Sequence, residues 1–356
     1  MNYSISAFRY FSIGLLIIFI LSFWAGLRGF DGVDTEVYLL FYQKLIDNGI
    51  VGIQSCQSFE PVYCGLSFTA GYISNNIFFV HYFWVFIYFS TTFRAFSILY
   101  NLVSPKYKFR FVAVLFFTFI AINFIDPQIV FFLTRQYVAS AFLMLGFAKI
   151  ATDKNPSISF IIATLIHFGA FPIALIAYVL SRKFELKWWY TITLPGAVLL
   201  LIYFWDSYIF EVYFESLKYK SVEYSDKNDG DVTPIQEVKL ILYWGLSAWF
   251  FLRKRIKIVL ALFFIYIFYL LTSFNDLLHL RYYKYLESMS WPAVFMLSYF
   301  FKRQAPYFIV AVLSFRIYKY LILVSPESGV FNVSMFWARH VFSFLLSWLE
   351  SNIIKF

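Results

Sequence analysis

The chain is poor in charged residues, and this scarcity limits the classes of protein to which it can belong. Asp, Glu, Lys and Arg make up 14% of the 356 residues, whereas a soluble globular protein has about a quarter. Hydrophobic residues account for 61%, and the mean hydropathy is +0.71. We therefore expect no separate soluble module, and we interpret residues 1–356 as a single membrane-embedded domain.

The motifs of several enzyme classes are also missing. The sequence has no Gly-rich phosphate loop of the P-loop type, no dinucleotide fingerprint, no His/Cys metal spacing and no Gly-x-Ser-x-Gly elbow. These absences argue against ATP-driven transport, zinc chemistry and serine hydrolysis. We accordingly expect no metal, no cofactor and no nucleic-acid partner.

The chain does contain a series of long apolar runs, at residues 10–27, 77–102, 109–125, 158–180, 188–205, 240–252, 258–274, 289–301 and 307–324. A hydrocarbon core about 30 Å thick is crossed by a helix of roughly 20 apolar residues. The pattern predicts an all-α fold, a polytopic transmembrane bundle of about 10 spans. The first run lacks a small-residue cleavage site, which indicates a retained helix and not a signal peptide.

Clusters of Lys and Arg orient the spans, because cytoplasmic loops collect these residues. The clusters lie at 106–110, 149–154, 182–187, 253–257 and 302–303. All of them fall inside only if residues 158–180 form a re-entrant hairpin, broken where His167, Phe168 and Gly169 stand just before Pro172. The alternative is one ordinary span that violates the positive-inside rule.

This topology places loops 28–61, 206–235 and 275–285 on the outer side. The only cysteines, Cys56 and Cys64, lie in or beside the first of these loops. An oxidising compartment would permit a disulfide between them. Two unpaired thiols are the alternative, because their separation cannot be read from the sequence.

The first outer loop begins with a candidate polar cluster. If this stretch is helical, Arg28, Asp31, Asp34 and Tyr38 share one face at spacings of 3, 3 and 4. A cation, two carboxylates and a phenol would then converge. A solvated loop with an Arg–Asp pair is the alternative.

Further polar residues stand inside or beside apolar runs. Arg135, followed by Gln136, would cost at least about 2.5 kcal/mol to bury, so it needs an anion, a water-filled cavity or the interface; snorkelling to the outer surface is the alternative. His167 is either an acid–base group or a hydrogen-bonded structural residue. Residues 279–285, with Arg281 and Tyr282, form a basic and aromatic cluster or an interfacial belt.

Arginines from three distant parts of the chain, Arg28, Arg135 and Arg281, are expected on the same side of the membrane. The planar fork of arginine matches phosphate oxygens, so they indicate a site for a phosphate or diphosphate headgroup. Carboxylates and a histidine would supply a base, for which we rank His167 first, then Asp34 and Asp31.

These motifs together carry a resemblance to a known family. In order they are LRGFDGVDTEVY at 27–38, Glu60-Pro61, TRQYVA at 134–139, ATLIHFGA at 163–170 and RYYKY at 281–285. They resemble the EpsG-like family of polysaccharide polymerases, which includes many O-antigen polymerases of the Wzy type. Phe30-Asp31-Gly32 stands where the family usually has a shorter glycine–aspartate step, so either Asp31 or Asp34 is the equivalent carboxylate.

The resemblance implies a GT-C-like glycosyltransferase in the bacterial inner membrane, with its active site facing the periplasm. It would join oligosaccharide repeat units carried on undecaprenyl diphosphate, which serve as both donor and acceptor. A chain-length regulator protein is a candidate partner. The alternatives are a flippase for lipid-linked oligosaccharides, an O-antigen ligase and an acyltransferase. The residues expected to bind substrate are Tyr38, Glu60, Gln136 and Tyr282.

Overall fold

The computed structural model describes residues 33–49, 60–103, 134–181, 232–252, 256–274 and 276–289. Every regular element within these ranges is a helix, as the predicted all-α fold requires. In this part of the chain, no helix is both long and apolar enough to cross a membrane. The chain divides into two units, Met1–Phe171 with Leu297–Phe356, and Pro172–Met296.

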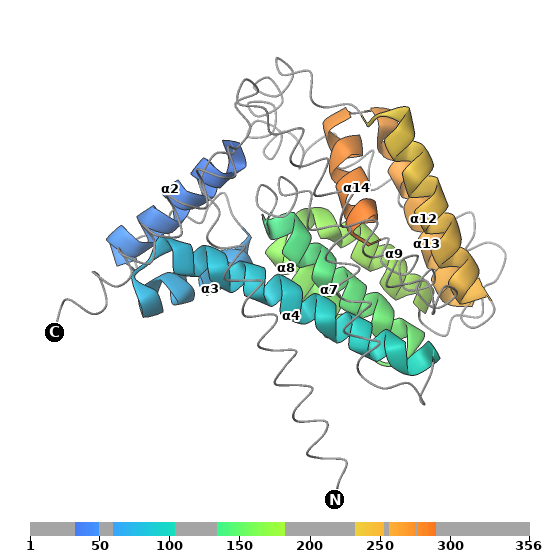
Figure 1. Ribbon diagram of the computed structural model, residues 1–356, viewed down its shortest axis with the longest axis horizontal. Helices are drawn as coiled ribbons and strands as arrows, with labels where there is room; N and C mark the ends of the chain where they lie inside the picture. The colour runs from blue at the N-terminus through green and yellow to red at the C-terminus, as the bar shows by residue number, and fades with distance from the viewer. Residues whose placement is uncertain are drawn as a thin grey trace, which may run out of the picture. The chain divides into compact units, whose positions relative to one another are not determined.

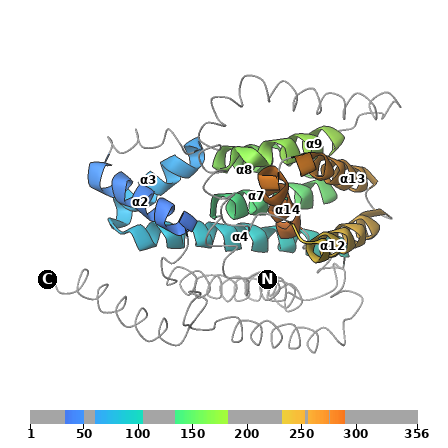
Figure 2. The same cartoon turned by 90° about the horizontal axis from the view of Figure 1, so that it is seen from above.

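The first unit contains a row of three helices. They are α4 (Ile77–Val103), α7 (Thr134–Ala151) and α8 (Ser157–Ile166). Helix α7 lies between the other two (Figures 1 and 2). Helices α2 (Val33–Asn48) and α3 (Pro61–Ser74) pack on each other and on α4, and α3 also contacts α8.

Helices α7 and α8 form an antiparallel hairpin. Lys149 Nζ donates a hydrogen bond to Ser159 Oγ at 2.8 Å, and three residues earlier on α7, Gly146 faces the ring of Phe160. A Cβ atom at Gly146 would lie 2.2 Å from Cε1 of that ring. Only glycine therefore permits this close approach of the two helices.

The interruption predicted at His167 is present. Helix α8 ends at Ile166, and its C-cap, His167, has an extended backbone (φ −153°, ψ 112°) that breaks the helical path. A short 3-10 turn, η2 (Phe168–Ala170), follows and leads into α9 (Phe171–Ser181). Since α9 runs into the second unit, the re-entrant reversal itself stays a prediction.

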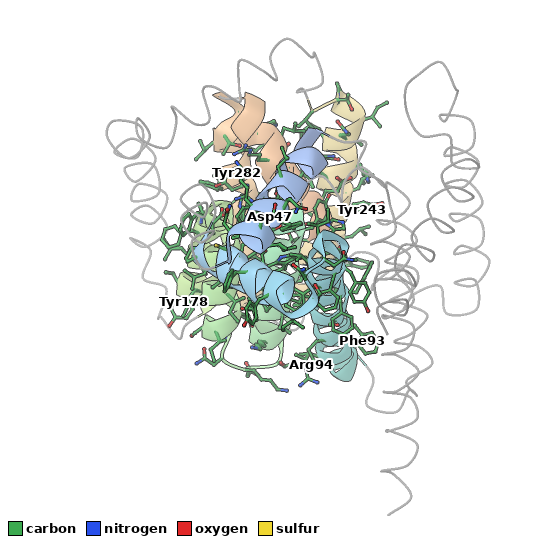
Figure 3. All side chains as sticks on the ribbon, turned by 90° about the vertical axis from the view of Figure 1, so that its left-hand side faces the viewer. Asp47, Phe93, Arg94, Tyr178, Tyr243 and Tyr282 are labelled. Carbon is green, nitrogen blue, oxygen red and sulfur yellow. The ribbon has the colours of Figure 1, made fainter. Side chains whose placement is uncertain are left out.

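The second unit holds the rest of α9 together with α12 (Pro234–Leu252), α13 (Ile256–Leu271), the 3-10 turn η4 (Thr272–Phe274) and α14 (Asp276–Ser288). Helix α12 lies along α13, and α14 packs against both (Figure 1). The indole nitrogen of Trp244 donates to the backbone oxygen of Leu286 at 3.2 Å, which links α12 to α14. Figure 3 labels Tyr178, Tyr243 and Tyr282 of this unit.

Candidate functional site

Arg135, in the first turn of α7, is held by a carboxylate and a phenol. Its Nη1 donates to Glu60 Oε2 at 2.6 Å, and its Nε donates to Tyr38 Oη at 3.1 Å. The Arg135 and Glu60 side chains are 16% and 8% exposed. The cation therefore meets an anion, the first of the three environments that its cost of burial allowed. That anion is supplied by the chain itself, from 75 residues away.

Glu60 is placed for this role by the start of α3. It is the N-cap residue, with Pro61 at the first helical position, and its backbone oxygen accepts from the N–H of Cys64 at 2.9 Å. Its side chain makes no capping bond to its own helix. The carboxylate is instead directed to other segments, and its Oε1 accepts from the N–H of Phe168 at 3.2 Å.

One carboxylate thus joins the start of α7 to the break after α8. Burial would raise the pKa of Glu60, but the guanidinium of Arg135 and, when protonated, the imidazole of His167 lower it, and the net result is a lowered pKa. Glu60 is therefore ionised at neutral pH, and its bonds to Arg135 and Phe168 are bonds to a charged acceptor, which are the stronger kind.

His167 caps the turn that follows it. Its Nδ1 accepts a hydrogen bond from the backbone N–H of Gly169 at 3.1 Å. The backbone N–H of His167 donates to the backbone oxygen of Ala163 at 3.0 Å. The side chain is partly exposed. The backbone N–H groups of Phe168 and Gly169, just past the break, thus both donate to side chains.

Aromatic rings surround the guanidinium. The carbon Cζ of Arg135 lies 5.6 Å from the ring centre of Tyr38 and 5.8 Å from that of Tyr63, within the range of cation–π attraction. The hydroxyls of Tyr42 and Tyr63 share a hydrogen bond, and Tyr63 stacks on Trp84 at 4.5 Å. The polar cluster therefore rests on the packed core of the first unit.

Sequence reasoning missed Tyr42 and Tyr63. Tyr42 follows Tyr38 by four residues, a helical spacing that places both on one face of α2 and could have revealed it. Tyr63 has no comparable signal, because its place beside Arg135 depends on how α3 packs against α7.

The structure says less about the other predicted site residues of the first unit. Gln136 is 3% exposed and lies in the packed interior of α7. Asp34 belongs to the first turn of α2, which begins at Val33. Arg28 and Asp31 lie outside the described residues. The expected convergence of Arg28, Asp31, Asp34 and Tyr38 on one helical face stays a prediction.

The predicted residues of the RYYKY motif belong to the second unit, on α14. Tyr282 is 8% exposed, and its ring meets that of Phe268 edge-on at 4.8 Å. Arg281, its neighbour in sequence, is partly exposed. A site shared by Arg28, Arg135 and Arg281, and a substrate contact by Tyr282, stay predictions.

A second polar cluster joins α12, α13 and α14, and it includes His279 from the predicted cluster at residues 279–285. Glu237 Oε1 accepts from the hydroxyl of Tyr269 and lies 3.0 Å from Nε2 of His279. The imidazole of His279 stacks on the ring of Tyr269 at 4.3 Å. Glu237 lies 32 positions before Tyr269 and 42 before His279, so neighbouring sequence could not reveal its partners. Among the described residues, no group of His, Cys, Asp and Glu is arranged to hold a metal ion.

Of the two alternatives for the cysteines, the disulfide is present. Cys64 is disulfide-bonded, and the other cysteine of the chain is Cys56, which lies outside the described residues. Cys64 is buried on α3, one helical turn after Glu60. The disulfide therefore anchors the segment that carries the carboxylate.

Comparison with known proteins identifies the family. The model of the EpsG family matches residues 11–338, a range that includes every motif of the predicted resemblance. No curated protein and no solved structure matches the chain. The resemblance seen in the sequence is confirmed.

Proposed function

The chain belongs to the EpsG family, and from this premise we propose that it is a glycosyltransferase that polymerises a bacterial surface polysaccharide. The proposed substrates are oligosaccharide repeat units linked to undecaprenyl diphosphate, such as those of an O-antigen. The proposed location is the inner membrane, with the site open to the periplasm.

The observation that carries this proposal is the cluster of Arg135, Glu60 and His167. Three ionisable side chains from segments far apart in sequence are gathered at helix ends in the first unit. Burying charged groups is costly, and such groups concentrate at functional sites. An arginine and a histidine near one carboxylate offer cationic donors that suit a ligand carrying phosphate.

The reaction can be written for this cluster. The bond between C1 of the reducing-end sugar and the diphosphate oxygen breaks, and its electron pair leaves with undecaprenyl diphosphate. A hydroxyl oxygen of the incoming unit bonds to C1, and its proton passes to a base. Cationic donors such as Arg135 stabilise the departing diphosphate. His167, Asp34 and Asp31 are the candidate bases.

The lengths of the α7–α8 hairpin can be compared with the predicted re-entrant segment. Helix α7 has 18 residues, about 27 Å at 1.5 Å per residue. Helix α8 has 10 residues, about 15 Å. If Lys149 and Lys154 mark the cytoplasmic end, α8 stops about half-way, as a re-entrant segment would.

The disulfide of Cys64 supports the proposed orientation. Disulfides persist in the periplasm and are rare in the bacterial cytosol. A disulfide on α3, one turn from Glu60, is therefore consistent with a site on the outer side of the inner membrane.

The proposal is tested by deleting the gene and viewing the surface polysaccharide on a gel. Loss of a polymerase leaves the lipid core bearing a single repeat unit, whereas loss of a flippase or ligase leaves no repeat at all. Plasmid-borne wild type should restore the ladder, and Arg135→Ala should not. Arg94→Ala is the matched control, because Arg94 is an exposed arginine on α4 of the same unit (Figure 3). A deletion strain with a normal ladder would refute the proposal.

A further inference from the structure

The position of the proton on His167 follows from its hydrogen bond. A neutral imidazole carries one proton, so one ring nitrogen donates and the other accepts. Nδ1 of His167 accepts from the N–H of Gly169 at 3.1 Å. The proton of the neutral ring is therefore on Nε2, which is a donor.

This arrangement is unsuited to a general base. A base needs an unprotonated nitrogen directed at the hydroxyl whose proton it takes. Nδ1 has its lone pair committed to the cap of η2, and Nε2 already bears the proton. His167 could act as a base only by giving up the bond that shapes the helix break.

The surroundings of His167 suit a donor to an anion. Glu60 binds Arg135 through one oxygen and the N–H of Phe168 through the other. The guanidinium and the residue that follows His167 are thus tied to the same carboxylate. The side chains of Arg135 and His167 both carry N–H donors, and the charge of Glu60 is balanced by that of Arg135.

We propose that His167 binds the departing diphosphate by donating a hydrogen bond from Nε2–H, and that it is not the base. This inference rests on the proposed function. As the C1–O bond breaks, its electron pair moves to the diphosphate oxygen, and Nε2–H stabilises the growing charge while keeping its proton. The proton of the attacking hydroxyl goes to a different group, which acts as the base.

The test is binding of undecaprenyl diphosphate to the purified full-length protein in detergent, beside turnover of a lipid-linked repeat unit. His167→Ser is the informative variant, because a serine hydroxyl can still accept from the N–H of Gly169 as a cap but is too short to replace Nε2. His167→Asn keeps a cap oxygen and adds an N–H donor, so it should recover part of the loss. Thermal melting of both variants shows that they remain folded.

The expected result is that His167→Ser weakens binding of undecaprenyl diphosphate at least about tenfold, as for a lost hydrogen bond to a charged group, and slows turnover. His167→Asn should fall between serine and wild type. Wild-type affinity in a His167→Ser protein that has lost turnover would identify His167 as the base. Wild-type affinity and wild-type turnover in His167→Ser would mean that His167 only caps the turn after α8. Either of these results overturns the inference.

The proposed function fails separately. If the wild-type protein binds undecaprenyl diphosphate no better than undecaprenyl monophosphate and shows no turnover, then both the diphosphate site and the role of His167 within it are refuted. If the wild type binds and turns over but His167→Ser is unchanged, only the role of the histidine is refuted.

Discussion

Glu60 is the residue on which the cluster depends, because its two oxygens serve two segments. Glu60→Gln should destabilise the protein by about 3 kcal/mol at pH 7, since it leaves the buried guanidinium of Arg135 without an anion. The measurement is thermal or denaturant unfolding in detergent. Asp47→Asn is the control, because Asp47 is an exposed acid on α2 (Figure 3).

The effect of Glu60→Gln should depend on pH. The pKa of Glu60 is lowered in the folded protein, so its contribution is fully present above the usual value of 4.5 and is lost as the pH falls through the folded value. The difference between wild type and variant should be constant from pH 7 to pH 5 and should shrink in more acidic buffer. A gap that widens on acidification would contradict the ion pair.

Substitutions of Arg135 give a second test of the site at the scale of single residues. Arg135→Ala should abolish polymerisation while the protein stays in the membrane fraction. Arg135→Lys should restore only part of the activity, because one ammonium cannot reproduce the planar fork that meets both Glu60 and Tyr38. The length of the polysaccharide ladder and the amount of membrane protein are measured together. A normal ladder from the alanine variant would remove Arg135 from the site.

At the scale of elements, Gly146 on α7 lies against the ring of Phe160 on α8. Gly146→Ala should lower stability by about 1–3 kcal/mol, since its Cβ would overlap the Phe160 ring. Gly65→Ala is the control, because a Cβ there meets nothing within 4 Å and alanine favours a helix. Unfolding midpoints of both variants give the comparison.

A second substitution checks the cause. Phe160→Leu removes ring atoms from the crowded place, so its cost and that of Gly146→Ala should be less than additive. Additive costs would mean that the two residues are not in contact.

The helix break illustrates what sequence can predict about elements. His167-Phe168-Gly169 before Pro172 indicated an interruption, because glycine and proline are local signals that need no distant partner. The acceptors of the N–H groups after the break could not be foreseen. One of them is Glu60, 108 residues away, and such a pairing depends on how α3 packs against α8.

Arg135 shows the same limit within the site. The cost of burying its charge predicted an anion, a cavity or the interface, but the identity of the anion depends on tertiary packing. Tyr282 shows the limit in another way. Its motif, RYYKY, is interpreted from the sequence as part of a basic and aromatic cluster or of an interfacial belt, and the ring lies in the interior of the second unit.

At the scale of the whole molecule, the all-helical character and the family could both be predicted, because composition and motif order survive without tertiary detail. The re-entrant hairpin at 158–180 remains to be tested. Cysteines placed at Lys154 and Lys183 should react with a thiol reagent from the same, cytoplasmic side. Lys183 lies outside the described residues, but labelling requires only its position in the sequence.

The controls for this labelling are a native cysteine and one further substitution. Cys64 is disulfide-bonded, so it should not react unless a reductant is added. Asp47→Cys, in the first outer loop, should react from the periplasmic side. Reaction of positions 154 and 183 from opposite sides would replace the hairpin with a single span.

The two amides just past the helix break offer a view of the site by hydrogen–deuterium exchange. Phe168 and Gly169 each donate to a side chain, Glu60 and His167 respectively, where a continuous helix would use backbone carbonyls. Amide protection at these two positions therefore reports whether each side chain is in place. A ligand that draws Glu60 away should speed exchange at Phe168 and leave Gly169 slow. Amide exchange at Phe168 and Gly169 should therefore report whether a ligand occupies the site, without an assay of glycosidic-bond formation.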